Sequence, residues 1–327
     1  MANKMKFSAN INTFNACADR YVLDGYGERR NTDELIKAAQ SVEDLTGVEL
    51  VGKWHVNDDN VEAIRKQVTD AGFEISCVTP DIWASGKWGW GSFTSRDEQI
   101  RKDAIHAVKK SMEWARQLDC KVIDLWFGQD GYDYIFQADY LQAWDLLIDG
   151  VQECAEHVPE VNIVIEYKPK EPRTHCFVST VGKTLLLLDK VNKSNVGAMI
   201  DVGHALQGYE NTAESASLLH YFGNKLFYMH FNDNWRMWDD DMTFGSVHTI
   251  ESLELIYWLD RLEYDGWYAL DIFPYREDGV RAANESIRWI KGFHNVLDQL
   301  DRGRIAEVIA SGDAMACSAL MREAFLG

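Results

Sequence analysis

The chain of 327 residues is 46% hydrophobic and 26% charged, which is typical of a globular protein with a large core. Its formal net charge of −19 argues against nucleic acid or an anionic membrane surface as a partner, because both would repel it. No apolar run reaches the roughly 18 residues that cross a bilayer, and residues 1–14 lack the apolar segment of a signal peptide.

Eight short apolar runs, each bounded by polar or turn residues, predict eight β-strands. In chain order the runs begin at Lys6, Val48, Phe73, Lys121, Asn162, Val196, Lys225 and Trp267. Segments between the runs carry apolar residues at helical spacing. Such segments are residues 97–118, 140–157, 184–191, 252–262 and 284–297.

The alternation of strand and helix predicts a parallel sheet, and eight repeats favour its closure into a barrel. A doubly wound open sheet is the alternative, but no GxGxxG motif follows the first strand. We therefore predict an α/β fold with a single (β/α)8 TIM barrel over residues 1–301. A short helical extension at residues 302–327 is expected to pack on the barrel or on a neighbouring subunit.

The six cysteines are scattered along the chain without a CxxC pair or a regular spacing. This pattern argues against a disulfide framework or a zinc knuckle, and it suits buried thiols in a reducing compartment. We therefore expect the protein to be cytoplasmic.

Ionisable residues stand at the ends of the fifth, sixth, seventh and eighth predicted strands. They are Glu166 and Lys168, Asp201 and His204, His230, and Asp271. Because the active site of such barrels lies at the carboxyl ends of the strands, we expect these residues to share one rim. Carboxylates and an imidazole gathered there would repel one another and desolvate badly without a cation. Oxygen ligands with imidazole favour Mg, Mn or Co.

The ionisable residues divide into two possible metal sites, which predicts one or two ions per chain. Four side chains could surround the first ion: Glu166, Asp201, His230 and Asp271. A second ion could be held by His204 together with Asp239 and Asp241, although an acidic turn in solvent would show the same spacing. Lys168 lies on the same strand face as Glu166 and could donate to a substrate oxygen; a structural ion pair is the alternative.

Four segments, in order along the chain, resemble motifs of the xylose-isomerase-like barrels, which include xylose and rhamnose isomerases. They are Trp126–Tyr132 (WFGQDGY), Glu166–Arg173 (EYKPKEPR), Asp239–Gly245 (DDDMTFG) and Asp271–Arg276 (DIFPYR). The corresponding family motifs read W-G-G-R-E-G-Y, E-x-K-P-x-E-P-R, D-x-D-L-R-F-G and D-x-x-P-x-R. As metal ligands, Asp201-x-x-His204 and His230 are more similar to the ligands of rhamnose isomerases than to those of xylose isomerases, which use Glu and Asp there.

The resemblance implies a divalent-metal-dependent enzyme that isomerises or epimerises a sugar, and a homo-oligomer. It further implies that Trp126 forms a wall of the sugar pocket and that Arg276 binds substrate. His55 and Asp58 have the H-x-x-D spacing of the family pair that opens the sugar ring, although a surface histidine before a helix start would look the same.

The same superfamily includes the large subunits of C-glycoside deglycosidases, which are lyases that eliminate the aglycone from a 3-oxo-glycoside. Trp83, Trp88 and Trp90 after the third strand would suit an aryl-bearing substrate of that kind. Such an enzyme would need a small partner subunit to complete its pocket. An abasic-site endonuclease would need more metal ligands and a basic face, and a non-catalytic sugar-binding module would not need Lys168 beside a ligand set.

Overall fold

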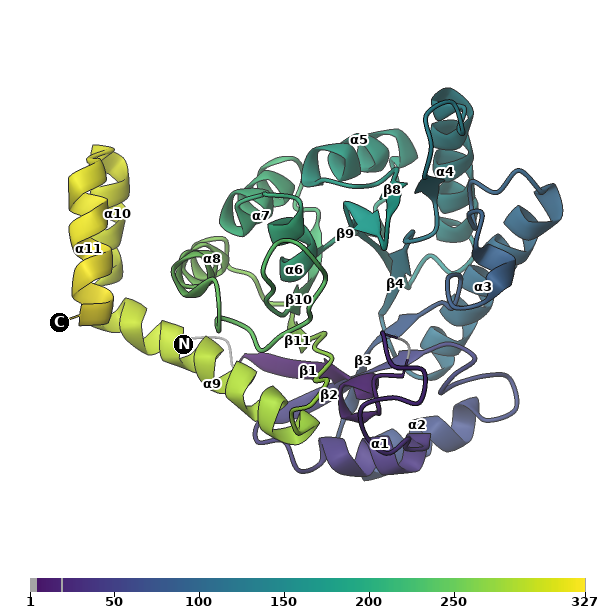
Figure 1. The fold of residues 1–327 in the computed structure, drawn as a ribbon, viewed down its shortest axis with the longest axis horizontal. Helices are drawn as coiled ribbons and strands as arrows, with labels where there is room; N and C mark the ends of the chain where they lie inside the picture. Colours follow the sequence, from purple (N-terminus) through teal and green to yellow (C-terminus); the bar gives the residue numbers. More distant parts are fainter. Residues whose placement is uncertain (1–4, 19, 327) are drawn as a thin grey trace.

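The structure is a computed structural model that describes residues 5–18 and 20–326, and it confirms the predicted TIM barrel. Eight parallel strands close in the order β1–β11–β10–β9–β6–β4–β3–β2, with helices around them (Figure 1). The strands are β1 (Lys6–Asn10), β2 (Leu45–Val51), β3 (Glu74–Thr79), β4 (Val122–Trp126), β6 (Asn162–Glu166), β9 (Val196–Asp201), β10 (Leu226–Phe231) and β11 (Trp267–Leu270). Two predictions fall partly outside the described residues. Residues 1–4 belong to the segment expected to lack a signal peptide, and Gly327 belongs to the predicted extension.

Helices connect the strands and cover the outside of the barrel. They are α1 (Thr32–Ala39), α2 (Val61–Asp70), α3 (Glu98–Gln117), α4 (Tyr140–Ala155), α5 (Val181–Val191), α6 (Val202–Gln207), α7 (Thr212–Tyr221), α8 (Thr249–Arg261) and α9 (Gly279–Leu300). The five helical segments expected from the sequence are confirmed as α3, α4, α5, α8 and α9. Because both faces of the sheet are covered, strands such as β9 are buried at every position.

Alternate residues of each strand face the barrel interior, so the interior side chains stack in layers. At the carboxyl ends of their strands, around the mouth, stand Asn10, Trp126, Glu166, Asp201, His230 and Asp271. The layer beneath it lies two residues earlier on each strand and includes Ser8, Glu49, Asp124 and Tyr228, all buried. Polar groups therefore continue below the mouth, where such barrels are filled mainly by branched apolar side chains.

A small antiparallel sheet lies beside the barrel mouth, and the sequence periodicity did not indicate it. It consists of β5 (Gly131–Tyr132), β7 (Lys170–Glu171) and β8 (Thr174–Cys176), in the order β5–β8–β7. The sheet joins the loop that follows β4 to the loop that follows β6. It therefore holds together two of the segments that carry the family motifs.

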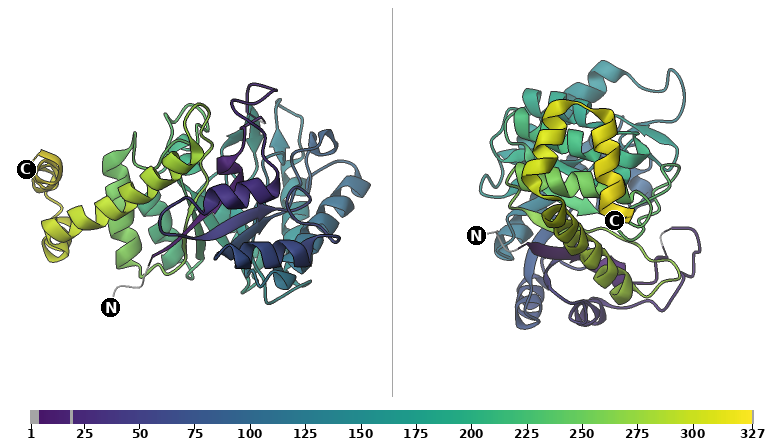
Figure 2. Two further views of the ribbon diagram at one scale, coloured as in Figure 1. Left: turned by 90° about the horizontal axis from the view of Figure 1, so that it is seen from below. Right: turned by 90° about the vertical axis from the view of Figure 1, so that its left-hand side faces the viewer.

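The predicted helical extension is confirmed as a hairpin of α10 (Arg302–Ser311) and α11 (Ala314–Leu326). Figures 1 and 2 show that it stands at the far end of α9, away from the barrel. An ion pair of 2.6 Å between Arg302 and Asp260 fixes α10 to the end of α8. The division into domains at residue 301 stays a prediction.

Among the described residues, no helix combines the length and the hydropathy that crossing a membrane requires.

Candidate active site

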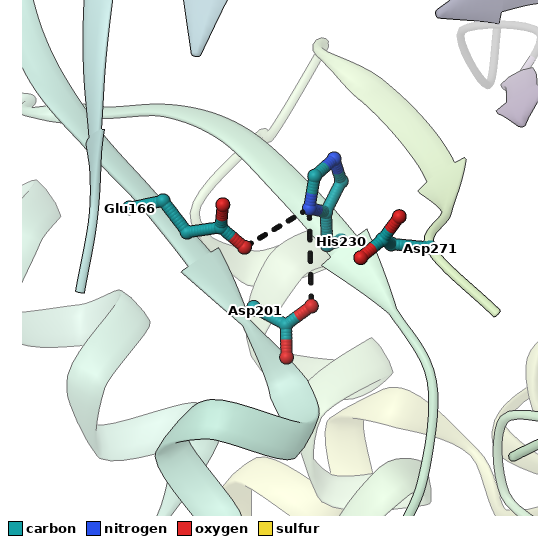
Figure 3. Close-up of side chains that lie close together, drawn as sticks. All are labelled: Glu166, Asp201, His230 and Asp271. Carbon is teal, nitrogen blue, oxygen red and sulfur yellow. Dashed lines mark hydrogen bonds and ion pairs between the residues drawn. The ribbon is translucent and has the colours of Figure 1, made fainter. Parts of the chain in front are cut away.

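Four side chains converge at the mouth from four consecutive strands of the barrel, as Figure 3 shows. Glu166 ends β6, Asp201 ends β9, His230 lies in β10, and Asp271 directly follows β11. One ligand atom from each lies within 4.8 Å of the others. Nδ1 of His230 faces the carboxylates, 3.3 Å from Oε1 of Glu166 and 3.8 Å from Oδ2 of Asp201.

This cluster fits a divalent cation. An ion with ligands about 2.0–2.2 Å away places those ligands about 3–4.4 Å apart, and the ligand atoms here lie within 4.8 Å of one another. Burial raises the pKa of Asp271 to about 7, and the negative charges of the neighbouring carboxylates Glu166 and Asp201 add to this increase. A bound cation would remove that repulsion. Three carboxylates and one imidazole suit Mg, Mn or Co better than a metal that prefers thiolate.

The local sequence around Asp201 orients its two oxygens differently. Oδ1 accepts a hydrogen bond of 2.8 Å from the backbone N–H of His204 and so caps α6. Oδ2 accepts from the side-chain amide of Asn232 at 2.8 Å and faces His230. Gly203 permits this arrangement, because a Cβ there would lie 2.7 Å from Oδ1 of Asn232. Asn10 similarly donates to Oδ1 of Asp271 at 3.2 Å.

A second group of potential ligands, formed by Asp201, His204 and Asp239, lies beside the first. Asp239 is already surrounded by cationic side chains. Nζ of Lys168 lies 2.7 Å from its Oδ2, and Nη1 of Arg20 lies 3.5 Å away. Burial would raise the pKa of Asp239, but Lys168 and His204 hold it well below its ordinary value. This carboxylate is thus neutralised without a second ion.

Asp241 and Lys168 are also engaged in ion pairs. Asp241 pairs with Arg20, whose guanidinium lies 4.3 Å from the ring centre of Phe273. Asp241 does not belong to either group of potential ligands found among the described residues. Lys168 is buried and pairs with Glu171 as well as Asp239. An ammonium has three donors, and these two carboxylates account for two of them. The role of Lys168 toward a substrate oxygen stays a prediction.

His204 makes the stability of the metal-free protein depend on pH. Burial alone would lower its pKa, but the carboxylates of Asp201 and Asp239 raise it to about 9. The unfolded-state pKa is near 6.5, so the stabilisation is complete below that value and is lost as pH rises through 9. We expect the Tm of chelator-treated protein to fall between pH 7 and 9. The variant H204N should flatten that slope; an equal slope in H204N would contradict the assignment.

The predicted pair of His55 and Asp58 is not formed in the structure. Asp58 is exposed and accepts hydrogen bonds of 2.8 Å from Trp114 and Lys110 of α3. His55 is buried, its Nδ1 accepts from the backbone N–H of Val51 at 2.9 Å, and burial lowers its pKa to about 4. The ring is therefore neutral and carries its proton on Nε2. His55 lines a cavity between the loops that follow β1 and β2, and Asp58 does not line it.

The structure places Trp126 and Arg276 in different surroundings. The ring of Trp126 lies 5.1 Å from Nζ of Lys168 and 5.3 Å from the ring of Trp83, so it forms a wall beside the cluster. Its buried Nε1 has no hydrogen-bond partner among the described residues. Arg276 is exposed, with its guanidinium 5.4 Å from the ring centre of Tyr26, and lines a groove along α9. Its role as a substrate ligand stays a prediction.

Two acidic residues of the layer beneath the mouth were missed by the sequence analysis. Glu49 lies 3.2 Å from Nε2 of His230. Burial and the neighbouring Glu166 raise the pKa of the Asp124 carboxyl well above its ordinary value. The available signal was a carboxylate inside an otherwise apolar strand run, at VELVG and KVIDLWF. Arg20, in the loop after β1, gave no signal at all.

Comparisons with known proteins place this geometry in context. The family model described as "Xylose isomerase-like TIM barrel" matches residues 36–293. A D-tagatose 3-epimerase-like protein is 20% identical, with 90% of this chain and 99% of that chain covered and a TM-score of 0.67. The 3-keto-D-glucoside 4-epimerase from E. coli is 16% identical, with 88% of this chain and 99% of that chain covered and a TM-score of 0.66. An L-ribulose 3-epimerase is 12% identical, with 93% of this chain and 98% of that chain covered and a TM-score of 0.69. At these identities the likeness concerns the fold.

Proposed function

This chain belongs to the xylose isomerase-like TIM barrel family, and we propose that it is a divalent-metal-dependent sugar epimerase or isomerase. The observation that carries the proposal is the convergence of Glu166, Asp201, His230 and Asp271 on one ion-sized space. The similarity in fold to a D-tagatose 3-epimerase-like protein and to an L-ribulose 3-epimerase supports a ketose as substrate.

The chemistry in this proposal is removal of a proton from the carbon beside a sugar carbonyl. A bound metal would polarise the carbonyl and the neighbouring hydroxyl oxygen. Glu166 and Asp271 lie on either side of His230 in Figure 3, so one carboxylate can take the proton while the other returns it. The remaining donor of Lys168 stabilises negative charge on the substrate oxygen.

We infer that one ion is bound rather than two. The position that a second ion would take beside Asp239 is supplied with positive charge by Lys168, Arg20 and His204. A second divalent cation there would face these groups at close range, which costs energy in a buried site. Within the described part of the chain, no lysine or arginine forms an ion pair with Glu166, Asp201 or Asp271, so their carboxylates are free to bind a cation.

Elimination from a 3-oxo-glycoside is a second candidate function, because it begins with the same proton transfer. A cavity of about 430 Å³ between the loops that follow β1 and β2 favours it, since none of the four ligands lines this space and it could hold an aglycone apart from the sugar ring on the ion. Trp54, His55 and Phe273 provide aromatic surface on part of its lining, and polar residues including Arg29 and Arg30 form much of the rest. The similar fold named as a 3-keto-D-glucoside 4-epimerase makes oxidised glycosides a sensible substrate class to test.

The experiment is an NMR assay in D2O with Mn²⁺ or Mg²⁺, using ketopentoses, ketohexoses and aryl 3-oxo-glucosides. We expect solvent deuterium to enter the carbon next to the carbonyl of one substrate, and a chelator to abolish the exchange. Appearance of an epimer or an aldose supports the first function, and release of the aryl group supports the second. No exchange with any of these substrates in metal-loaded protein would contradict both.

A further inference from the structure

Glu49 contacts the side of the His230 ring that faces away from the metal cluster. Its two carboxylate oxygens lie 3.3 and 3.2 Å from Nε2 of His230. The opposite ring nitrogen, Nδ1, lies 3.3 Å from Oε1 of Glu166. The imidazole therefore spans two kinds of acceptor: the ligand group at the mouth and a single carboxylate in the layer beneath it.

Glu49 is itself held in place from across the barrel. The hydroxyl of Tyr228 donates to Oε1 of Glu49 at 2.7 Å, and both side chains are almost completely buried. Tyr228 lies two residues before His230 on the same face of β10, and Glu49 lies in β2. Since β1 and β11 separate these two strands, the contact crosses the barrel interior and does not follow from strand pairing.

The contact has a chemical consequence for His230. A carboxylate only accepts hydrogen bonds, so the nitrogen that faces it carries the ring hydrogen, and the other nitrogen of a neutral imidazole keeps its lone pair. A buried carboxylate is costly, and an apolar side chain would fill the same space at lower cost. Its presence under the only histidine of the four-residue ligand group is accounted for if it fixes that ring.

We propose that Glu49 is a positioning residue of the metal site, which holds His230 with the lone pair of Nδ1 directed at the ion. The inference rests on the proposed function, because it needs an ion at the cluster of Glu166, Asp201, His230 and Asp271. Tyr228 supports the same arrangement by occupying one oxygen of Glu49 and so fixing the plane of the carboxylate.

Two measurements test this role. In 15N-histidine NMR of Mg²⁺-loaded wild-type protein, with H230N to assign the signal, the hydrogen of His230 should reside on Nε2. In E49Q the carboxamide can also donate, so part of the population should carry the hydrogen on Nδ1. Calorimetric titration with Mn²⁺ should then show a loss of affinity of about 10–100-fold in E49Q. M199L, a buried substitution in the same interior layer, should leave the affinity unchanged.

The outcomes separate the two proposals. Wild-type protein that binds neither Mn²⁺ nor Mg²⁺ contradicts the proposed function itself. Wild-type protein that binds metal but carries the His230 hydrogen on Nδ1 overturns the role of Glu49, and this measurement requires no Glu49 variant to fold. A folded E49Q with wild-type affinity and an unchanged His230 signal overturns it as well, and would leave Glu49 as a residue of the barrel core only.

Discussion

Replacing Glu166 by glutamine is expected to lower kcat/KM by about 10³-fold or more while the protein remains folded. The side chain lies in the buried ligand group, and burial would raise its pKa, but the hydrogen bond with His230 holds the pKa below the ordinary value. The amide of E166Q removes a charged metal ligand and the proposed proton acceptor together, and a loss of about 4 kcal/mol of transition-state stabilisation corresponds to that factor.

The measurement is steady-state turnover of the substrate identified in the D2O assay, together with the metal content after dialysis. E160Q is the matched control, because Glu160 is an exposed glutamate that forms an ion pair of 3.7 Å with Arg116 on the surface. We expect its kinetics and metal content to equal those of wild type. If E166Q bound metal and turned over substrate like E160Q, the cluster would not be the active site.

Replacing Lys168 by methionine is expected to reduce both stability and activity. Lys168 is buried at the meeting point of Asp239, Glu171 and Trp126, and it supplies the cation closest to Asp239. Removing it leaves buried carboxylates less well paired, which costs about 3–5 kcal/mol in the free energy of unfolding. Loss of its remaining donor should lower kcat by about 10²–10³-fold, as for removal of one oxyanion-stabilising group.

Urea unfolding of chelator-treated protein gives the stability difference without a contribution from bound metal. K193M is the control, since Lys193 pairs at 2.6 Å with the exposed Glu156 on the surface and should cost no more than about 1 kcal/mol. Equal destabilisation of K168M and K193M would show that the buried ion pairs of Lys168 contribute no more to the free energy of unfolding than a surface ion pair does. Wild-type turnover by K168M would remove Lys168 from the chemistry.

The fold could be predicted because each strand is a short apolar run buried on both faces, and this pattern depends on local sequence alone. The meeting of Glu166, Asp201, His230 and Asp271 could also be predicted, because each stands at the end of a strand in a parallel barrel. The position of the cluster thus follows from strand topology and does not depend on loop structure.

The remaining features depend on how loops and distant residues meet. Asp241 pairs with Arg20, which lies 221 residues away in a different loop, and no spacing rule connects them. Asp58 has the expected spacing from His55, but the intervening turn directs its carboxylate to α3. Glu49 sits inside an apolar run, where a carboxylate is visible in the sequence but its partner on the other side of the barrel is not.

The most direct test of the account is a count of the metal ions bound per chain. Purified protein would be stripped with a chelator, titrated calorimetrically with Mn²⁺, and assayed for metal content after dialysis, with E166Q alongside. We expect one ion per wild-type chain and none in E166Q, with activity restored in proportion to the ion bound. Two ions per chain would contradict the ion-pair role of Lys168 and Arg20 at Asp239, and no bound ion would contradict the metal site itself.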